Sequence, residues 1–261
     1  MMRLAQLTRP AVVLAFFLLH ATGTLAAQAE VALRLSLELS VTRESLTNDR
    51  GDWREESVGV GIDRGRQRVG YVNGRHTERF GLNDREIGAG LVLRPDATLT
   101  IVLDATSSDT HRVLAKDSLG AQISSAIGDG WVIGGGLKRS RYGGSNAMLS
   151  NLAVERYVGS WRIGYTAYLS RATATPYSSS HRLGLSYYFR DDLSVALSGA
   201  RGNELENAPG QGLRTAAITN VSGSAMWRVT PDFWLTLDAG RQRQGDLYTR
   251  RGVRAGARLG F

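Results

Sequence analysis

The sequence contains no cysteine, few lysines and no long apolar run beyond its first 29 residues. Without thiols the chain cannot form a disulfide framework or a thiolate metal site. No stretch after residue 29 approaches the ~18 apolar residues that indicate a membrane-spanning helix. Lys116 and Lys138 are the only lysines, so arginine supplies nearly all of the positive charge. Disulfide-rich secreted domains and helical membrane proteins are therefore not expected.

Residues 1–29 have the pattern of a secretory signal peptide. Arg3 and Arg9 make a basic start, residues 11–19 form an unbroken apolar run, and Ala-Gln-Ala at 27–29 is a small-x-small cleavage site. The run is shorter than the ~20 helical residues that span a bilayer. Cleavage would leave a mature chain, 30–261, with 30 basic and 24 acidic side chains and a net charge of +6. An exported chain of this kind is either a soluble β protein or a membrane barrel.

Apolar and polar residues alternate with a period of two through most of the mature sequence, which is typical of strands with one buried face. The C-terminal segment 247–261 shows this most strictly. Its apolar face consists of Val253, Ala255, Ala257, Leu259 and Phe261. Bacterial outer-membrane barrels commonly end on such a strand with a terminal Phe, so we expect these five residues to form the signal that the barrel-assembly machinery reads.

The alternating segments predict about fourteen strands, with twelve as the alternative. The expected ranges are 31–43, 53–63, 66–79, 85–93, 98–106, 113–127, 131–142, 147–158, 161–171, 180–189, 193–201, 214–229, 233–243 and 247–261. Val69 and Tyr71 are expected on the outer face of the third segment. Residues 202–213 form the longest expected loop.

The connections between these segments distinguish a membrane barrel from a soluble sandwich. Tight turns alternate with mostly longer connections, which is the order of short periplasmic turns and external loops in an up-and-down outer-membrane barrel. Large aromatic side chains gather near the tight turns or the C-terminus, namely Trp131, Tyr157, Trp161, Phe189, Trp227, Phe233, Trp234 and Phe261. Such rings prefer the lipid headgroup level, whereas in a sandwich they would lie mid-strand in the core. We therefore predict an all-β protein, a transmembrane antiparallel β-barrel over 30–261 in the outer membrane.

Several of these segments also carry a family resemblance. Residues 51–59 (GDWREESVG) and 79–84 (RFGLND), together with 157–161 (YVGSW) and 179–190, resemble the YaiO family of outer-membrane β-barrel proteins. The resemblance covers most of the mature chain. It implies a location in the outer membrane of a Gram-negative envelope and leaves the activity undefined. Related domains are similar to the barrel end of exopolysaccharide-export proteins, so a part in polysaccharide export is one alternative role.

Strand parity places charged side chains of both signs on the inward face. The candidate lumen-lining residues are Arg34, Glu38, Arg68, Glu86, Asp104, Lys116, Glu155, Arg162, Arg182, Asp238, Arg254 and Arg258. Buried charges must pair, because bare ones are costly. Eight-stranded barrels are filled by side chains and barrels of sixteen or more leave a channel, so fourteen strands are compatible with a plugged structural barrel or a narrow pore. Small anionic or sugar solutes are the expected cargo of such a narrow pore, and the excess of arginine supports the preference for anions.

The sequence favours a protein without enzymatic activity, cofactor or metal. The mature histidines are His76, His111 and His181, and local neighbours such as Glu78 do not show that a nucleophile, a base and an orienting group converge. Metal-ligand spacings and phosphate loops are absent, and no basic helix or ordered basic run predicts binding to nucleic acid. Outer-membrane lipid is the expected partner. An enzyme that acts on lipid or glycan is the remaining alternative.

Overall fold

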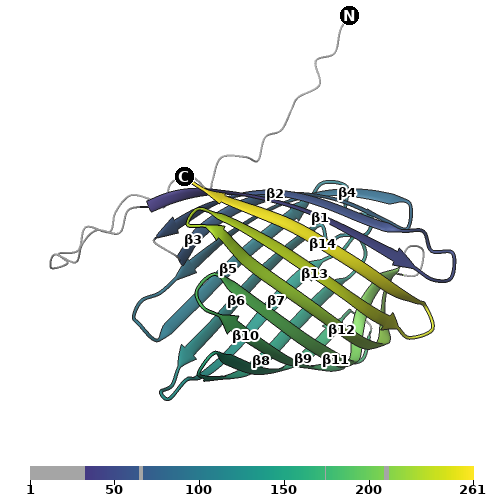
Figure 1. Ribbon diagram of the computed structural model, residues 1–261. Coiled ribbons are helices and arrows are strands. Elements are labelled where there is room, and N and C mark those ends of the chain that lie inside the picture. Colours follow the sequence, from purple (N-terminus) through teal and green to yellow (C-terminus); the bar gives the residue numbers. More distant parts are fainter. Residues whose placement is uncertain (1–32, 65–66, 174, 209–211) are drawn as a thin grey trace, which may run out of the picture. The chain divides into compact units, whose positions relative to one another are not determined.

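Fourteen antiparallel strands close into a barrel in the computed structural model of this protein (Figure 1). The structure describes residues 33–64, 67–173, 175–208 and 212–261, so the expected signal peptide lies outside the described residues. The strands are β1 (Leu33–Leu46), β2 (Trp53–Arg64), β3 (Gln67–Arg79), β4 (Leu82–Leu93), β5 (Leu99–Ser108), β6 (Asp117–Ala126), β7 (Trp131–Arg141), β8 (Asn146–Val158), β9 (Trp161–Ala172), β10 (Ser178–Phe189), β11 (Leu193–Ala208), β12 (Gly212–Thr230), β13 (Phe233–Gln244) and β14 (Tyr248–Gly260). The prediction of fourteen strands is confirmed, and the alternative of twelve is wrong.

The first and last strands close the sheet. β14 pairs with β1 from Ser36↔Gly260 to Leu46↔Arg250, and every other strand pairs with its neighbours in sequence. Beyond the end of β14, the backbones of Leu35 and Phe261 exchange two hydrogen bonds of 3.1 and 3.0 Å. Closure matters because hydrocarbon offers no partner to a free strand edge.

The distribution of side chains is the reverse of that in a water-soluble protein. Large apolar side chains cover the outside, as at Leu152 and Leu183, which are 71% and 63% exposed. The largest fully buried side chains are polar, namely Gln244, Thr77, Asp84, Ser36 and Ser180. This arrangement is stable only if the outer face meets lipid rather than water. In the described ranges no helix is long and apolar enough to cross a membrane.

The two ends of the barrel differ. Tight connections such as 159–160, 190–192 and 231–232 lie at the end where β1 starts and β14 stops, and we call this the periplasmic end. The opposite, external end has longer connections such as 109–116, although 80–81 is as short as a periplasmic turn. Most rings of the expected girdle are exposed at the periplasmic end, including Trp131, Trp161, Phe189 and Trp227. Trp234 differs, because it turns inward and its ring lies 4.3 Å from the Arg258 guanidinium.

A β-bulge changes the parity of one strand. The register passes from Ile62↔Gly70 to Asp63↔Arg68, so Val69 has no partner on β2. The extra residue lets both Arg68 and Tyr71 face the lumen, where they line one cavity. The prediction that Tyr71 faces outward is therefore wrong, because alternation cannot show an inserted residue.

Two predicted boundaries are also wrong. β6 starts at Asp117, because residues 112–114 belong to a loop whose backbone N–H groups bond to a side chain rather than to a neighbouring strand. Residues 202–213 are not a long loop, because β11 and β12 continue to pair as far as Ala208↔Gly212. The polar composition of this hairpin fits strands that extend beyond the hydrocarbon.

A charge on the outer face tests the orientation of the strands. Leu183→Arg, in the middle of β10, should destabilise the barrel by roughly 2–4 kcal/mol, because the lipid-facing arginine cannot be hydrated. Gly184→Arg is the matched control, since Gly184 lines a lumen cavity and an added Cβ meets no atom within 4 Å. Urea unfolding in lipid vesicles, followed by tryptophan fluorescence, measures both variants. Equal destabilisation by the two would contradict the assigned faces.

Candidate functional site: the barrel lumen and its external mouth

Ion pairs cover one wall of the lumen, and we call it the ion-pair wall. A first network on this wall lies near the periplasmic end. The Arg68 guanidinium lies 2.9 Å from a carboxylate oxygen of Glu38 and 3.3 Å from one of Asp63. It also donates a hydrogen bond of 3.1 Å to the Ser36 hydroxyl. Arg258 approaches the same Asp63 carboxylate at 3.9 Å. Four strands, β1, β2, β3 and β14, are thereby connected through their inward side chains.

The same wall carries a second network closer to the external end. Arg75 contacts Glu86 at 2.6 Å and Glu55 at 3.3 Å, and Arg79 contacts Glu55 at 3.5 Å. Lys138 lies 3.7 Å from Asp104 across the face of β5, β6 and β7. Nearly every cation on this wall therefore has a carboxylate partner, as buried charges require.

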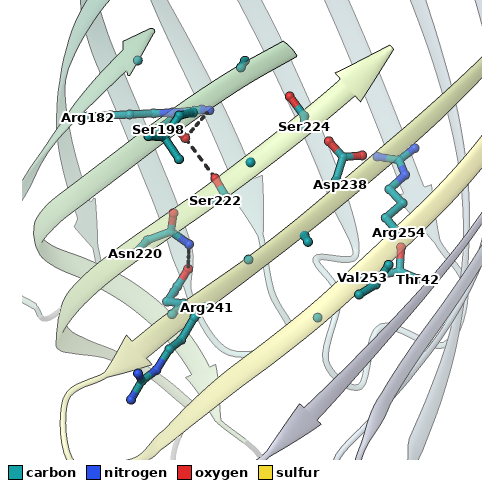
Figure 2. A pocket seen from close by; sticks show the side chains of 18 of the residues that line it. Thr42, Arg182, Ser198, Asn220, Ser222, Ser224, Asp238, Arg241, Val253 and Arg254 are labelled. Atoms are coloured by element: carbon teal, nitrogen blue, oxygen red, sulfur yellow. Dashed lines mark hydrogen bonds between the residues drawn. The ribbon is translucent and has the colours of Figure 1, made fainter. Parts of the chain in front are cut away.

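The opposite wall, formed by β9 to β14, is lined mostly by hydroxyl groups and arginines, with the Asp238 carboxylate among them (Figure 2). Arg182 donates to the Ser198 hydroxyl at 3.1 Å, and Ser198 in turn lies 2.9 Å from the Ser222 hydroxyl. Among the described residues no carboxylate lies within ion-pair distance of Arg182. Arg254 points toward Asp238, its cross-strand neighbour, without an ion pair to it (Figure 2). We call this surface the serine–arginine wall.

The loop of residues 109–116 folds into the external mouth of the barrel. The fully buried Asp84 carboxylate accepts hydrogen bonds from the backbone N–H groups of Arg112, Val113 and Leu114 at 2.9, 2.7 and 2.8 Å. One charged group thus satisfies three consecutive loop donors that no strand ladder pairs. Residues 113–115 are buried as a result.

This loop reaches the far side of the barrel. The Asn207 side chain on β11 donates to the Val113 carbonyl oxygen at 3.0 Å, although four strands separate β6 from β11. Tyr142 and Glu206 line the same cavity as the loop. Burial, followed by the negative charge of Glu206, raises the pKa of the Tyr142 phenol, so the ring stays neutral. The loop therefore narrows the external opening.

Aromatic side chains pack beside the loop inside the mouth. Trp53, Phe80 and Tyr248 form a T-shaped cluster with ring centroids 5.0 to 6.1 Å apart. The guanidinium groups of Arg79 and Arg250 lie 4.7 and 5.3 Å from the Trp53 ring. The Tyr248 hydroxyl donates to Glu206 at 2.9 Å and so connects β14 to β11. The barrel thus has a small core at its mouth rather than at its centre.

Most candidate lumen residues lie on the inner face of a strand. Nine of them line the two walls described above, namely Glu38, Arg68, Glu86, Asp104, Arg162, Arg182, Asp238, Arg254 and Arg258. Glu155 lies 3.7 Å from Arg162. Arg34 lies at the periplasmic rim, 3.0 Å from Asp232.

Lys116 is the exception, because it lies exposed in the loop before β6 rather than on a strand. The Lys116 backbone N–H still donates to the Arg141 carbonyl oxygen at 2.7 Å, and its carbonyl oxygen accepts from the Ser108 N–H at 2.8 Å, so the residue lies at the external edge of the sheet. Sequence reasoning also missed Asp84, Asn207 and Glu206. Their partners lie at least 28 positions away in the chain, so no local pattern reports them.

The histidines are far from forming one site. His76 is exposed on β3, and His111 lies in the mouth loop with a φ of 34°. His181 is exposed on β10, where a ring nitrogen lies 2.7 Å from the Tyr165 hydroxyl of the neighbouring strand. Within the described ranges there is no group of three or more histidine, aspartate or glutamate side chains placed to hold a metal ion.

A family model described as the YaiO membrane beta barrel domain matches residues 35–206, from β1 into β11. The chain belongs to the YaiO family. The resemblance carried by residues 51–59 and 79–84 is thus confirmed, and this YaiO barrel is an outer-membrane protein. No curated protein matches the chain.

Solved structures show the same architecture. An outer membrane channel from Pseudomonas putida is 11% identical with a TM-score of 0.57, and the match covers 91% of this chain and 100% of that one. The outer membrane protein Omp33 of Acinetobacter baumannii is 13% identical with a TM-score of 0.53, and the match covers 87% and 99%. At such low identity the likeness shows the fold alone.

Removing the charge of Asp84 should release the mouth loop of the YaiO barrel. In Asp84→Asn the carboxylate is replaced by a neutral amide, which has one acceptor oxygen instead of two. It can no longer accept hydrogen bonds from all three backbone N–H groups. We expect a loss of roughly 3 kcal/mol of local stability and about 100-fold faster amide exchange at residues 112–114. Hydrogen–deuterium exchange with mass spectrometry measures the exchange rate of these amides. Asp117→Asn is the control, since it breaks only the exposed pair with Arg141. Unchanged exchange in Asp84→Asn would refute the anchoring role.

Proposed function

We propose that this YaiO barrel is a narrow pore for small anionic or hydroxyl-rich solutes of the sugar-acid kind. The observation that carries the proposal is Arg182, a cation on the serine–arginine wall that has a hydroxyl partner but no carboxylate partner among the described residues. Guanidinium stays protonated at any physiological pH, so the positive charge is permanent. A passing anion would find an attractive group that is not already neutralised.

The chemistry of the two walls supports this direction of selectivity. On the ion-pair wall, the carboxylates of Glu38, Glu86 and Asp104 are occupied by arginine or lysine. They therefore offer little to a cation. On the serine–arginine wall, hydroxyl groups and the Asn220 and Gln242 amides can replace the water of a hydroxylated solute.

The mouth supports a restriction on size. The loop held by Asp84 and the cluster around Trp53 both lie in the external opening, next to each other. Only small solutes would pass such a constriction. A second candidate is a closed barrel with a purely structural role, and this same filled mouth is the observation that favours it.

Substitution of the two arginines tests the selectivity. Arg182→Gln combined with Arg254→Gln should lower the ratio of anion to cation permeability by about threefold, because two permanent charges leave the wall. The measurement is the reversal potential across a planar bilayer under a salt gradient. Arg139→Gln with Arg201→Gln is the matched control, since it removes two arginines that are exposed on the outer face.

The outcomes separate the two candidates. Unitary currents whose anion preference falls in the lumen variant but not in the control support the pore. Currents with no anion preference, or with the same preference in both double variants, would contradict it. Complete silence of the wild type and of the loosened Asp84→Asn variant would favour the closed structural barrel.

A further inference from the structure

Three outward arginines lie together near the external end of β13, β14 and β1. Arg241 and Arg251 are direct cross-strand partners. Arg43 is paired with Val253, so Arg251 is its diagonal neighbour two positions along β14. Long side chains reach one another across such a diagonal. The register therefore places the three arginines next to one another across the seam that closes the barrel, and we call them the seam patch.

The three arginines of the seam patch are not paired with carboxylates, although acidic side chains line the groove beside them. Among the described residues, Arg43, Arg241 and Arg251 make no ion pair and no side-chain hydrogen bond, and all three are exposed. The flanking arginines differ, because Arg54 is bonded to Glu56 and Arg243 lies 3.6 Å from Asp246. Like charges directly opposite one another destabilise a sheet. An anion bound from outside would remove this penalty.

The position of the patch indicates what kind of anion this is. Each arginine directly continues the apolar outer face of its strand, following Val41 on β1 and Ala239 on β13 and preceding Val253 on β14. A surface groove beside the patch is lined by Arg43, Arg54 and Arg251, by the apolar Ala239 and Val253, and by the acidic residues Glu44, Asp52 and Glu78, so charged and apolar groups meet in it. Charge just beyond an apolar face lies at the level of the lipid headgroups.

We propose that the seam patch binds the phosphate groups of an anionic, phosphorylated glycolipid of the outer leaflet. Guanidinium groups match phosphate oxygens with paired hydrogen bonds. The acyl chains of the same molecule would lie against Val41, Val253 and the apolar residues beneath them. This arrangement satisfies both parts of the groove at once, whereas a free phosphate ion would leave the apolar part uncovered.

A binding titration by native mass spectrometry in detergent tests the proposal. The probe is lipid A that carries both of its phosphates. The triple variant Arg43→Gln, Arg241→Gln, Arg251→Gln should bind it at least tenfold more weakly than the wild type, because three charge-assisted contacts are lost. The control triple Arg85→Gln, Arg139→Gln, Arg201→Gln removes three exposed arginines from β4, β7 and β11, which are not neighbours, and should keep wild-type affinity.

Two further arms separate the sources of phosphate. Lipid A stripped of its phosphates should bind the wild type as weakly as the seam variant does, and inorganic phosphate should not displace the intact lipid at equal concentration. Equal loss in both triple variants would show non-specific charge attraction and overturn the proposal. Undiminished binding of the stripped lipid, or displacement by inorganic phosphate, would overturn it as well. Heat-modifiable gel migration confirms that each variant is folded.

Discussion

Pairing between β14 and β1 is the constraint on which the rest of this barrel depends. In hydrocarbon each unpaired backbone N–H or C=O group costs several kcal/mol, so a sheet in a membrane must have no open edge. The ladder from Ser36↔Gly260 to Leu46↔Arg250 removes both edges at once. Once the sheet is closed, it has an inside and an outside, and the chemistry of every side chain follows from the face on which it lies.

Closure leaves an interior that is polar and must satisfy itself. Carboxylates accept from arginines along the ion-pair wall, and the Ser198 hydroxyl accepts from Arg182 on the other wall. The Asp84 carboxylate also accepts hydrogen bonds from backbone N–H groups of a loop that contacts β11. The interior is therefore held by hydrogen bonds between distant strands. Among the residues that the structure describes, the buried apolar cluster lies at the mouth, around Trp53 and Tyr248.

Adjacent arginines in this protein have opposite surroundings. Arg250 faces inward, where its guanidinium contacts Glu44 at 3.3 Å and lies over the Trp53 ring. Arg251, the next residue, faces outward in the seam patch without a partner among the described residues. The near absence of lysine fits both settings, because guanidinium is weakly hydrated, stacks on rings and binds carboxylate or phosphate through paired hydrogen bonds.

The sequence by itself determined the fold class, the number of strands and the face of most residues. Alternation is a local property of an extended chain, so segments such as 247–261 report which side chains meet lipid. The tertiary structure decided the bulge at Val69, the fold of residues 109–116 and the long β11–β12 hairpin. It also decided which inward charges are paired and which remain unpaired. These features depend on contacts such as Asp84 with Val113 and Glu206 with Tyr248, between groups that only barrel closure brings together.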